Sequence, residues 1–329
     1  MGIPFGVVGV GHLGKFHARL AAGIPELDFQ GVYDVDRTCC LEVAETTGVT
    51  ACSSLDDLLQ RVDAVSIVVP TVMHHEVARA ALEAGCHVFL EKPITATVAE
   101  AEDLIQLAEA RGLKLQVGHI ERFNPALLAL EGHDIRPMFI ESHRLSPFNP
   151  RGTDVSVVLD LMIHDLDIIL NLVGSPVASV DSCGVAVVSE VEDIANVRIS
   201  FENGAVANVT SSRISMKAMR RMRLFQPNKY LILDFLEKKA EIFTLPEPGG
   251  KGPGLPVATL GTGDRSRPVY YDRPQSPEVN ALEMELREFA RAVSAGENTK
   301  VTGREGLRAL ELATTILRQM KRGPATGRS

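Results

Sequence analysis

The sequence predicts an α/β protein of two domains, the first built on a parallel sheet and the second on a mainly antiparallel one. The chain has 329 residues, more than one ordinary hydrophobic core accommodates. In its first third, apolar runs of strand length alternate with stretches of helical period, which is typical of a parallel sheet covered on both faces. Later segments follow one another with short turns, which indicates antiparallel pairing.

The alternation in the first third predicts five strands and five helices. The strands are expected at residues 4–10, 29–33, 64–69, 87–90 and 114–117. The helices are expected at residues 13–22, 38–47, 55–60, 75–84 and 98–110. Gly85 and Gly112 follow two of these helical stretches, as C-terminal caps do.

The pattern changes near residue 122, so we place the domains at 1–121 and 122–329. A long helix at 154–173 should stop at Gly174-Ser175-Pro176. Strands are expected at 177–188, 194–201, 205–212, 219–225 and 230–235. Residues 247–267 are rich in glycine and proline and predict a surface loop. Closing helices are expected near 277–295 and 303–320, where they are able to pack back on the first domain.

Composition narrows the class of protein. A net charge of −8 makes a nucleic-acid-binding surface a poor first hypothesis. The five cysteines form no C-x-x-C pair and no spacing suited to zinc, so we expect reduced thiols and no metal. The N-terminus has no basic region of a secretory signal, and no apolar run approaches the ~18 residues of a membrane span. We therefore expect a cytoplasmic protein with no membrane partner.

A glycine-rich turn follows the first predicted strand and opens the first helix. It reads Gly9-Val10-Gly11-His12-Leu13-Gly14. In such a turn the first glycine allows the tight bend, the second lets the backbone approach a pyrophosphate, and the third lets helix and strand pack closely. The free N–H groups at the start of the helix attract phosphate. The sequence therefore predicts a dinucleotide-binding site.

Asp34 ends the second strand, about 20 residues beyond the glycine turn. A carboxylate in this position accepts hydrogen bonds from the adenosine ribose hydroxyls and repels a 2′-phosphate, which favours NAD over NADP. Arg37 lies close enough to stack on adenine or to meet a phosphate. We place both residues in the cofactor site.

Lys92 lies in Glu91-Lys92-Pro93, at the carboxyl end of a predicted strand. Ligands of open α/β sheets bind at that edge. A lysine there can donate to a substrate hydroxyl or to the cofactor ribose, and its pKa falls when it is desolvated. The alternative is a solvated surface lysine ahead of a proline.

Asp160 and His164 lie four residues apart in the long predicted helix, so an α-helix would present them on one face. A carboxylate can hold an imidazole by one nitrogen and leave the other nitrogen free as an acid or a base. The surrounding residues are mostly apolar, and charges in such a helix are costly unless they are paired or used. The alternative is an ordinary ion pair on a helix surface.

Taken in order, these motifs resemble the Gfo/Idh/MocA family of oxidoreductases, over about residues 3–322. The resemblance rests on the glycine turn, Pro70-Thr71-Val72-Met73-His74, Glu91-Lys92-Pro93, Gly118-His119, Arg122-Phe123-Asn124-Pro125 and Asp160-x-x-x-His164. It implies a Rossmann domain followed by an open-faced antiparallel α/β domain. The open sheet face commonly forms a dimer or tetramer interface in such proteins, so we expect a homodimer or homotetramer through the C-terminal sheet.

The resemblance also implies residue roles. Lys92 and His164 would carry the acid–base chemistry, and Asp160 would orient His164. The nicotinamide half of the cofactor would lie along the strand-end segment from Pro70 and along Thr71, His74, Glu91 and His119. The chain departs from many relatives in having Thr71 in place of an asparagine and Val157-Val158 in place of a glycine pair.

The segment Gly118–Pro125, with Arg122 and Asn124, is most similar to members acting on nucleotide-activated amino sugars. Those relatives oxidise the C3 hydroxyl of UDP-N-acetylglucosamine or its uronate. A basic cluster made of Arg213, Lys217, Arg220 and Arg221 would then meet the substrate diphosphate, with Arg144 and Arg151 as further candidates. The alternative for this cluster is a solvated sheet edge.

Two other functions remain open from the sequence. One keeps the enzyme class and changes the substrate to a free polyol, an aldose, a dihydrodiol or, as in a biliverdin-type reductase, a linear tetrapyrrole. The other is a catalytically silent NAD-sensing regulator of the same fold. The presence of both Lys92 and His164 favours an enzyme, because a pure binder needs neither.

Overall fold

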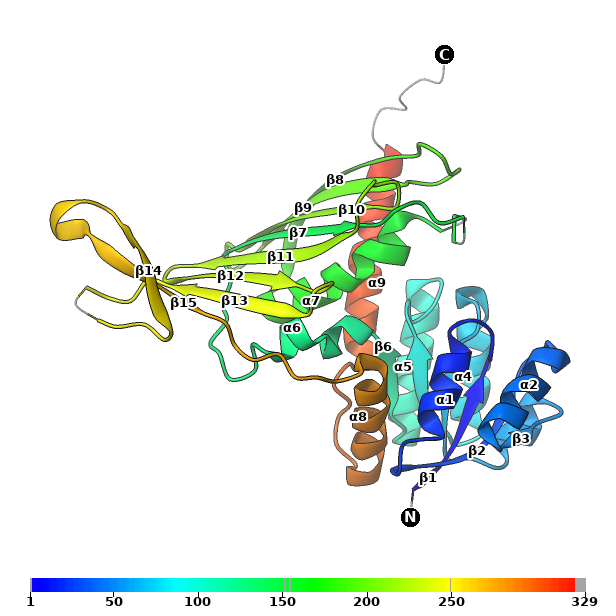
Figure 1. Cartoon of the computed structure of the whole chain (residues 1–329). Helices are drawn as coiled ribbons and strands as arrows, with labels where there is room; N and C mark the ends of the chain where they lie inside the picture. Colours follow the sequence, from blue (N-terminus) through cyan, green and yellow to red (C-terminus); the bar gives the residue numbers. More distant parts are fainter. Residues whose placement is uncertain (1, 151, 154, 249, 323–329) are drawn as a thin grey trace. The chain divides into compact units, whose positions relative to one another are not determined.

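The structure is a computed structural model that describes residues 2–322 except Arg151, Asp154 and Gly249. These residues divide into two units (Figure 1). Unit 1 consists of residues 2–123 and Val279–Glu311, and unit 2 of Asn124–Glu278 and residues 312–322. Along the chain, unit 2 first begins at Asn124, two residues beyond the expected start of the second domain at residue 122. None of the described helices is long and apolar enough to cross a membrane.

Unit 1 contains a six-stranded, wholly parallel sheet in the order β3-β2-β1-β4-β5-β6. Its strands are β1 (Ile3–Val8), β2 (Leu27–Tyr33), β3 (Thr50–Ala51), β4 (Ala64–Ile67), β5 (His87–Glu91) and β6 (Leu115–Gly118). All four residues of β4 are buried, as expected for a central strand covered on both faces. The predicted Rossmann-like sheet is confirmed.

Several helices of unit 1 begin at capping residues that the sequence provides. Thr97 and Glu100 form a reciprocal capping box at the start of α5, and Gly112 ends it with a φ of 66°. The elements are α1 (Gly14–Ala21), α2 (Arg37–Thr47), α3 (Leu55–Leu59), η1 (Thr71–Met73), α4 (His74–Glu83), α5 (Val98–Arg111), η2 (Ile120–Phe123) and α8 (Ala281–Ala295).

Helix α8 follows the strands of unit 2 in the sequence yet completes the core of unit 1. Leu286, Phe289 and Ala290 are fully buried in the same apolar cluster as Phe5 of β1. The ring of Phe289 packs edge-on against Phe89 of β5, with centroids 5.8 Å apart. Unit 1 is therefore assembled from two distant stretches of the sequence.

Unit 2 contains a nine-stranded sheet in the order β14-β15-β13-β12-β11-β7-β10-β9-β8. Among the described strands of this sheet, every neighbouring pair is antiparallel except β7 and β10. The strands are β7 (Phe139–Leu145), β8 (Val177–Val185), β9 (Ile194–Phe201), β10 (Val206–Ser212), β11 (Met219–Gln226), β12 (Lys229–Asp234), β13 (Lys239–Thr244), β14 (Leu255–Leu260) and β15 (Arg267–Asp272). The predicted mainly antiparallel sheet is confirmed.

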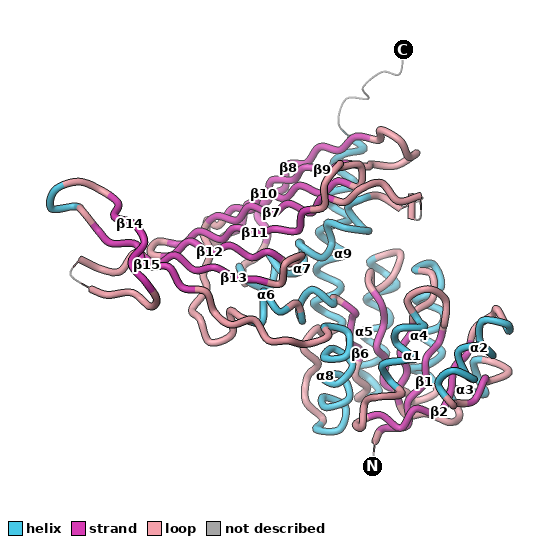
Figure 2. The backbone as a smooth tube through the Cα atoms, in the orientation of Figure 1, coloured by secondary structure: helices cyan, strands magenta, loops and turns pink. Residues whose placement is uncertain are grey.

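The prediction of a surface loop at residues 247–267 is wrong in part, because this stretch contains strand β14. All six residues of β14 are exposed, so the strand has no alternation of apolar and polar residues to signal it. Its pairing with β15 shifts register between Pro256 and Ala258, which is tolerated in an edge strand. In Figure 2 this hairpin extends beyond the end of the sheet.

One face of the sheet in unit 2 is covered by helices and the other is open. In β9 the buried residues alternate strictly with more exposed ones, as a one-sided sheet requires. The covering helices are α6 (Pro125–Leu128), α7 (Ile163–Val173) and the end of α9 (Gly303–Arg322). Ser182 and Gln319 fix that end of α9 against β8 by a hydrogen bond of 2.8 Å.

Candidate active site

The glycine turn after β1 leaves room for a ligand close to the backbone. Gly9 has a φ of 82°, and a Cβ there would lie 2.6 Å from the carbonyl oxygen of Val68. A Cβ on Gly14 would lie 1.9 Å from the carbonyl oxygen of Gly9, so only glycine lets α1 start against the strand. A Cβ on Gly11 would meet nothing within 4 Å. The open space therefore lies at the glycine where a pyrophosphate approaches.

The start of α1 fits the same group. No side chain caps its first N–H groups, and Leu13 occupies the cap position. Uncapped N–H groups at a helix start, with the positive end of the helix dipole, stabilise phosphate. His12, in the turn, packs edge-on against Phe16 with ring centroids 6.0 Å apart.

Asp34 follows β2 and is held against the glycine turn. Its Oδ2 accepts a hydrogen bond of 2.7 Å from the N–H of Val10, and its Oδ1 accepts one of 2.8 Å from the N–H of Asp36. The exposed Arg37 donates to the carbonyl oxygens of Cys52 (2.7 Å) and Ala51 (3.2 Å). The carboxylate is thus fixed beside the turn, and the guanidinium is fixed beside β3.

Large apolar side chains are exposed at the carboxyl ends of neighbouring strands. Leu13 after β1, Val35 after β2 and Val72 after β4 are 56%, 91% and 75% exposed. Pro70 is exposed and Thr71 is half-buried at the start of η1. Ligands of parallel sheets bind at this edge, and the exposed apolar side chains there provide a contact surface for the flat rings of a ligand.

Glu91, the last residue of β5, is a carboxylate among basic groups. Its Oε1 lies 3.2 Å from Nε2 of His17 on α1, and its Oε2 accepts the N–H of Lys92 at 3.2 Å. Burial alone would raise the pKa of Glu91, but the hydrogen bond and charge of His17 and the charge of Lys92 outweigh it. The pKa of Glu91 therefore lies below its usual value. Lys92 follows an ionised carboxylate.

His74 ties the turn after Lys92 to the end of β4. The buried ring has its Nδ1 2.8 Å from the carbonyl oxygen of Pro93 and its Nε2 3.0 Å from that of Val69. Burial lowers the pKa of His74, although both carbonyls and Glu91 act in the opposite direction. The neutral ring donates to one carbonyl, and the protonated ring donates to both.

The predicted residues after β6 are buried. His119 is completely buried, and Nη2 of Arg122 lies 3.3 Å from Oε1 of Glu305. Asn124 caps α6 by accepting the N–H of Ala126 at 3.0 Å, and it donates to the carbonyl oxygen of Phe235 at 3.0 Å. These contacts hold Arg122 and Asn124 in the fold, and substrate contact by either residue stays a prediction.

In unit 2, the prediction of one α-helix over residues 154–173 is wrong in its first part. Residues Val158–Met162 form a π-helical turn, η3, and the α-helix α7 begins only at Ile163. Asp160 lies in the π-helical turn and His164 in α7, so the α-helical spacing that placed them on one face does not hold across them. Both side chains are partly buried. Single π-helical turns inside helices are frequent at functional sites.

Arg144 and Asp165 form a buried ion pair between β7 and α7. Nε and Nη2 of Arg144 donate to the two carboxylate oxygens at 2.8 and 3.0 Å, and both side chains are at most 3% exposed. The guanidinium also lies 5.9 Å from the ring centre of Phe235. Arg144 thus anchors α7 to the sheet, and its expected contact with substrate stays a prediction.

Arg213, expected at the substrate diphosphate, is buried and binds the loop that precedes η3. Its Nη1 donates to the carbonyl oxygen of Gly152 at 2.7 Å, and its Nη2 donates to that of Val155. Its Nε lies 4.0 Å from Oδ1 of Asp193. Burial raises the pKa of Asp193, but hydrogen bonds from Ser189 and the neighbouring N–H groups outweigh it, so the pKa is lowered.

The structure divides the rest of the basic cluster. Lys217, Arg220 and Arg221 are exposed. Arg220 lies directly opposite Arg144 in the β11–β7 pair, on the helix-covered face, whereas its neighbour Arg221 points to the open face and pairs with Asp234 at 3.0 Å. Arg151 lies outside the described residues. Lys217 and Arg220 therefore remain the exposed candidates for an anionic substrate.

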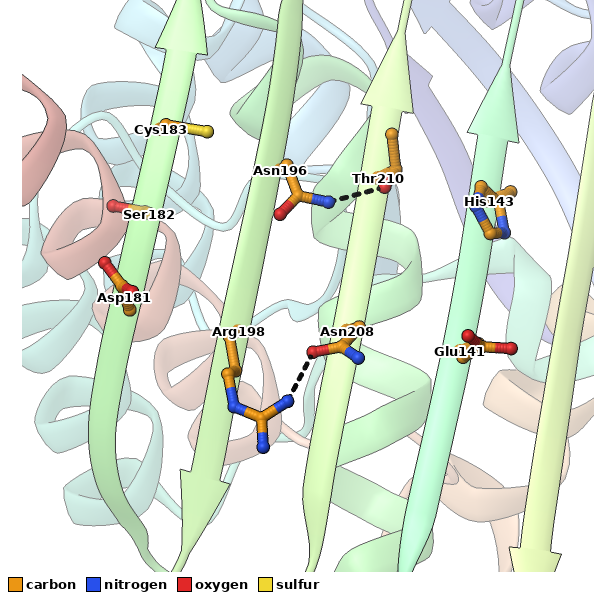
Figure 3. A pocket seen from close by; sticks show the side chains of 9 residues that line it. All are labelled: Glu141, His143, Asp181, Ser182, Cys183, Asn196, Arg198, Asn208 and Thr210. Carbon is orange, nitrogen blue, oxygen red and sulfur yellow. Dashed lines mark hydrogen bonds between the residues drawn. The ribbon is translucent and has the colours of Figure 1, made fainter.

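A groove of about 530 Å³ lies on the open face of the unit 2 sheet (Figure 3). Asn196 donates to Thr210 at 2.8 Å and Arg198 donates to Asn208 at 3.1 Å across its floor. None of the predicted site residues that the structure describes lines this groove. Among the described residues, no group of three or more His, Cys, Asp or Glu side chains is placed to hold a metal ion.

The structure brings the predicted cofactor residues of unit 1 together at the carboxyl edge of its sheet. Lys92 belongs to unit 1, while Asp160 and His164 belong to unit 2, so the catalytic set stays a prediction. Sequence reasoning missed His17, and it expected Arg213 at the substrate, whereas Arg213 is buried against the loop before η3. A histidine at a buried helix position three residues after Gly14 was a signal for His17, but nothing local connects it with Glu91.

Known proteins show the same two-part organisation. Residues 3–119 match an oxidoreductase family with an NAD-binding Rossmann fold, and residues 136–226 match the GFO/IDH/MocA C-terminal domain. UDP-N-acetylglucosamine 3-dehydrogenase from Acidithiobacillus ferrooxidans is 39% identical over 312 residues, covering 94% of this chain and 95% of that protein.

Further similarities agree. A solved structure of the A. ferrooxidans UDP-N-acetylglucosamine 3-dehydrogenase GnnA has a TM-score of 0.88, at 37% identity and with 98% of each chain covered. Myo-inositol 2-dehydrogenase from Thermotoga maritima is 26% identical, with 93% of each chain covered. With both domains matched and a relative of this identity over nearly its whole length, the chain belongs to the Gfo/Idh/MocA family of oxidoreductases.

Proposed function

We propose that the chain is an NAD-dependent dehydrogenase that oxidises the C3 hydroxyl of a UDP-amino sugar such as UDP-N-acetylglucosamine. The observation that carries the substrate is the 39% identity over 94% of the chain to an enzyme of that name. The exposed Lys217 and Arg220 supply positive charge suited to a diphosphate.

The residues of unit 1 fit the cofactor. The open space at Gly11 and the uncapped start of α1 suit the pyrophosphate, and the carboxylate of Asp34 suits a ribose with a free 2′-hydroxyl. These features favour NAD over NADP. Bound NAD⁺ supplies the acceptor for the hydride that leaves the sugar carbon.

The chain's own residues then handle the proton. His164 accepts the proton of the C3 hydroxyl as the carbon gives up its hydride, so that the alcohol becomes a ketone. Asp160 orients the imidazole, and the ammonium of Lys92 stabilises the developing alkoxide. Glu91 keeps negative charge next to Lys92, which favours its protonated form.

A panel of sugars tests the proposal. The purified chain is given NAD⁺ with UDP-N-acetylglucosamine, its uronate, other UDP-sugars, free inositols and aldoses, and reduced cofactor is followed by absorbance. We expect turnover with a UDP-amino sugar and a product lacking two hydrogens by mass spectrometry. Turnover with inositols alone would favour the second candidate, a polyol dehydrogenase, to which the relative from T. maritima points. Tight NADH binding without any turnover would favour a silent sensor.

We also propose that the chain forms a homodimer or homotetramer through the open face of the unit 2 sheet. Half-buried aromatic rings cross five strands there in one row, with centroids 4.6–5.7 Å apart. The row consists of Phe139, Phe225, Tyr230, Phe243 and Tyr271. Sedimentation of Tyr230→Asp should show monomers, whereas an unchanged oligomer would place the interface elsewhere.

A further inference from the structure

His17 connects two neighbouring strands of the parallel sheet in unit 1. The ring is 2% exposed on α1. Its Nδ1 lies 2.8 Å from Oγ of the fully buried Ser66 on β4, and its Nε2 lies 3.2 Å from Oε1 of Glu91 on β5. Phe89 packs edge-on against the ring, with centroids 5.6 Å apart. These contacts fix both the position and the orientation of the imidazole.

The chemistry of the three groups fixes the direction of the hydrogen bonds. An ionised carboxylate accepts only, so Nε2 of His17 donates to Glu91. In the neutral ring Nδ1 then accepts from the hydroxyl of Ser66, and in the protonated ring it donates to that oxygen. Ser66 therefore orients the ring in either protonation state.

The Glu91 carboxylate lies close to the backbone of Gly118, where a larger residue would crowd it. Gly118 of β6 is its partner in the strand register, and a Cβ there would lie 3.0 Å from Oε1 of Glu91. The titratable groups that act on this carboxylate are His17 from α1, His74 from α4 and Lys92 of its own strand end. His119 is the first residue after β6.

We propose that His17 is a positioning residue of the active site which, held by Ser66, fixes the Glu91 carboxylate against Lys92. The inference rests on the proposed function, because that function gives Lys92 its role. Without His17, Glu91 keeps its burial and the N–H of Lys92 but loses the hydrogen bond and charge of the imidazole, so the pKa of Glu91 rises. The negative charge that favours the ammonium of Lys92 weakens, and the pKa of Lys92 falls.

The first test needs no substrate. The lysines of the full chain are labelled with isotope-enriched methyl groups. The NMR signal of Lys92 is assigned by its loss in Lys92→Arg, and its change with pH gives the titration midpoint of Lys92. We expect a lower midpoint for Lys92 in His17→Leu and a near-normal midpoint in His17→Gln, whose amide can donate to Glu91. His75→Leu is the matched control, because it removes another histidine–carboxylate pair, with Asp103 at 2.7 Å. An unchanged Lys92 midpoint in His17→Leu would overturn the inference.

The second test is a double-mutant cycle on turnover. We expect His17→Leu to lower kcat about 10- to 100-fold, as displacement of a positioned group does, with the KM for NAD little changed. The variant His17→Leu/Glu91→Gln should be no slower than Glu91→Gln alone, since His17 acts through Glu91. If the fold-losses in kcat of the two single variants multiplied in the double variant, the inference would be overturned.

The two tests separate failure of the inference from failure of the proposed function. If the unmodified chain oxidises no sugar, the proposed function is wrong, and the lysine titration still decides the role of His17. If His17→Leu does not fold, Ser66→Ala removes only the contact at Nδ1. It should lower the Lys92 midpoint in the same direction by a smaller amount, and no shift would overturn the inference.

Discussion

Unit 1 and unit 2 carry their candidate site residues in different ways. In unit 1 the glycine turn, Asp34 and Glu91 lie at the carboxyl ends of parallel strands, so their positions at one edge come from the topology of the sheet. In unit 2 Asp160 lies in a π-helical turn, whose surroundings are fixed by buried arginines. Arg144 holds α7, and Arg213 holds the loop before η3.

The difference shows that a cofactor site can be specified by backbone layout, whereas this candidate acid–base helix depends on specific long-range side-chain pairs. Substitutions in unit 1 should therefore alter ligand recognition with little loss of folding. Substitutions of the buried charges in unit 2 should alter folding itself. The four predictions that follow test this contrast.

The largest expected effect concerns the proposed acid–base residues, Lys92 of unit 1 and His164 of unit 2. Under the proposed mechanism, Lys92→Ala and His164→Ala should each lower kcat by about 10²–10⁴-fold, because each would remove a proposed acid, base or charge. Cofactor absorbance with the UDP-sugar measures turnover, and fluorescence titration should show that NADH still binds. His133→Ala is the control. Near-normal turnover in both variants would remove the assigned mechanism.

The second prediction concerns buried charge in unit 2. Arg144→Met leaves Asp165 without its bidentate partner and should lower the free energy of unfolding by about 3–5 kcal/mol. Urea denaturation measures the loss. The control is Arg304→Met in unit 1, which removes an ion pair with Glu109. The side chains of Arg304 and Glu109 are 68% and 52% exposed, so this substitution should lower the free energy of unfolding by only about 0–1 kcal/mol. Equal losses in the two variants would contradict the contrast between the units.

The third prediction concerns pH. The pKa of Asp193 is depressed in the folded chain, so its contribution to stability is present above the unfolded value of 3.8 and is lost as the pH falls further. Asp193→Asn should lower the free energy of unfolding at neutral pH by about 1.5–3 kcal/mol, the contribution of a hydrogen bond to a charged group. Below pH 3.8, the difference in the free energy of unfolding between Asp193→Asn and the unmodified chain should become smaller.

The control for the pH prediction is Asp103→Asn in unit 1. Hydrogen bonds from Arg79 and His75 lower the pKa of Asp103, but its side chain is 42% exposed and solvent weakens the effect. A pH dependence as large as that of Asp193 would show that burial is not what separates the two units.

The smallest expected effect concerns cofactor choice in unit 1. Asp34→Asn removes the negative charge that opposes a 2′-phosphate, so the preference for NAD over NADP should fall about tenfold, or 1.4 kcal/mol. The ratio of kcat/KM for the two cofactors measures it. Asp36→Asn is the matched control, since Asp36 caps α2 through Thr38 and Cys39. An unchanged ratio in Asp34→Asn would place the discrimination elsewhere, with Arg37 the first alternative.

The sequence predicted the regular parts of both sheets because burial there follows simple periods. Strand β9 was predicted with its observed bounds, Ile194–Phe201. Strand β7 was missed because two of its inward residues, Ser142 and Arg144, are polar and hide the alternation. Edge strand β14 was missed because neither of its faces is buried.

For the site, local motifs gave the glycine turn, Asp34 and Glu91-Lys92-Pro93, since each carries its structural context within a few residues. The π-helical turn was not predictable, because a single wide turn leaves no period to detect. The pairing of His17 with Glu91 was not predictable either. It joins residues that only the sheet topology brings within 3.2 Å.

The contribution of α8 to the core of unit 1 has a consequence for biosynthesis. Phe89 emerges from the ribosome long before its ring partner Phe289, which lies much later in the sequence. Until then, the growing polypeptide exposes an apolar surface that helix α8 will cover, which is the kind of surface that chaperones recognise. Expression of residues 1–123 alone would keep that surface exposed, so a productive truncation has to retain α8.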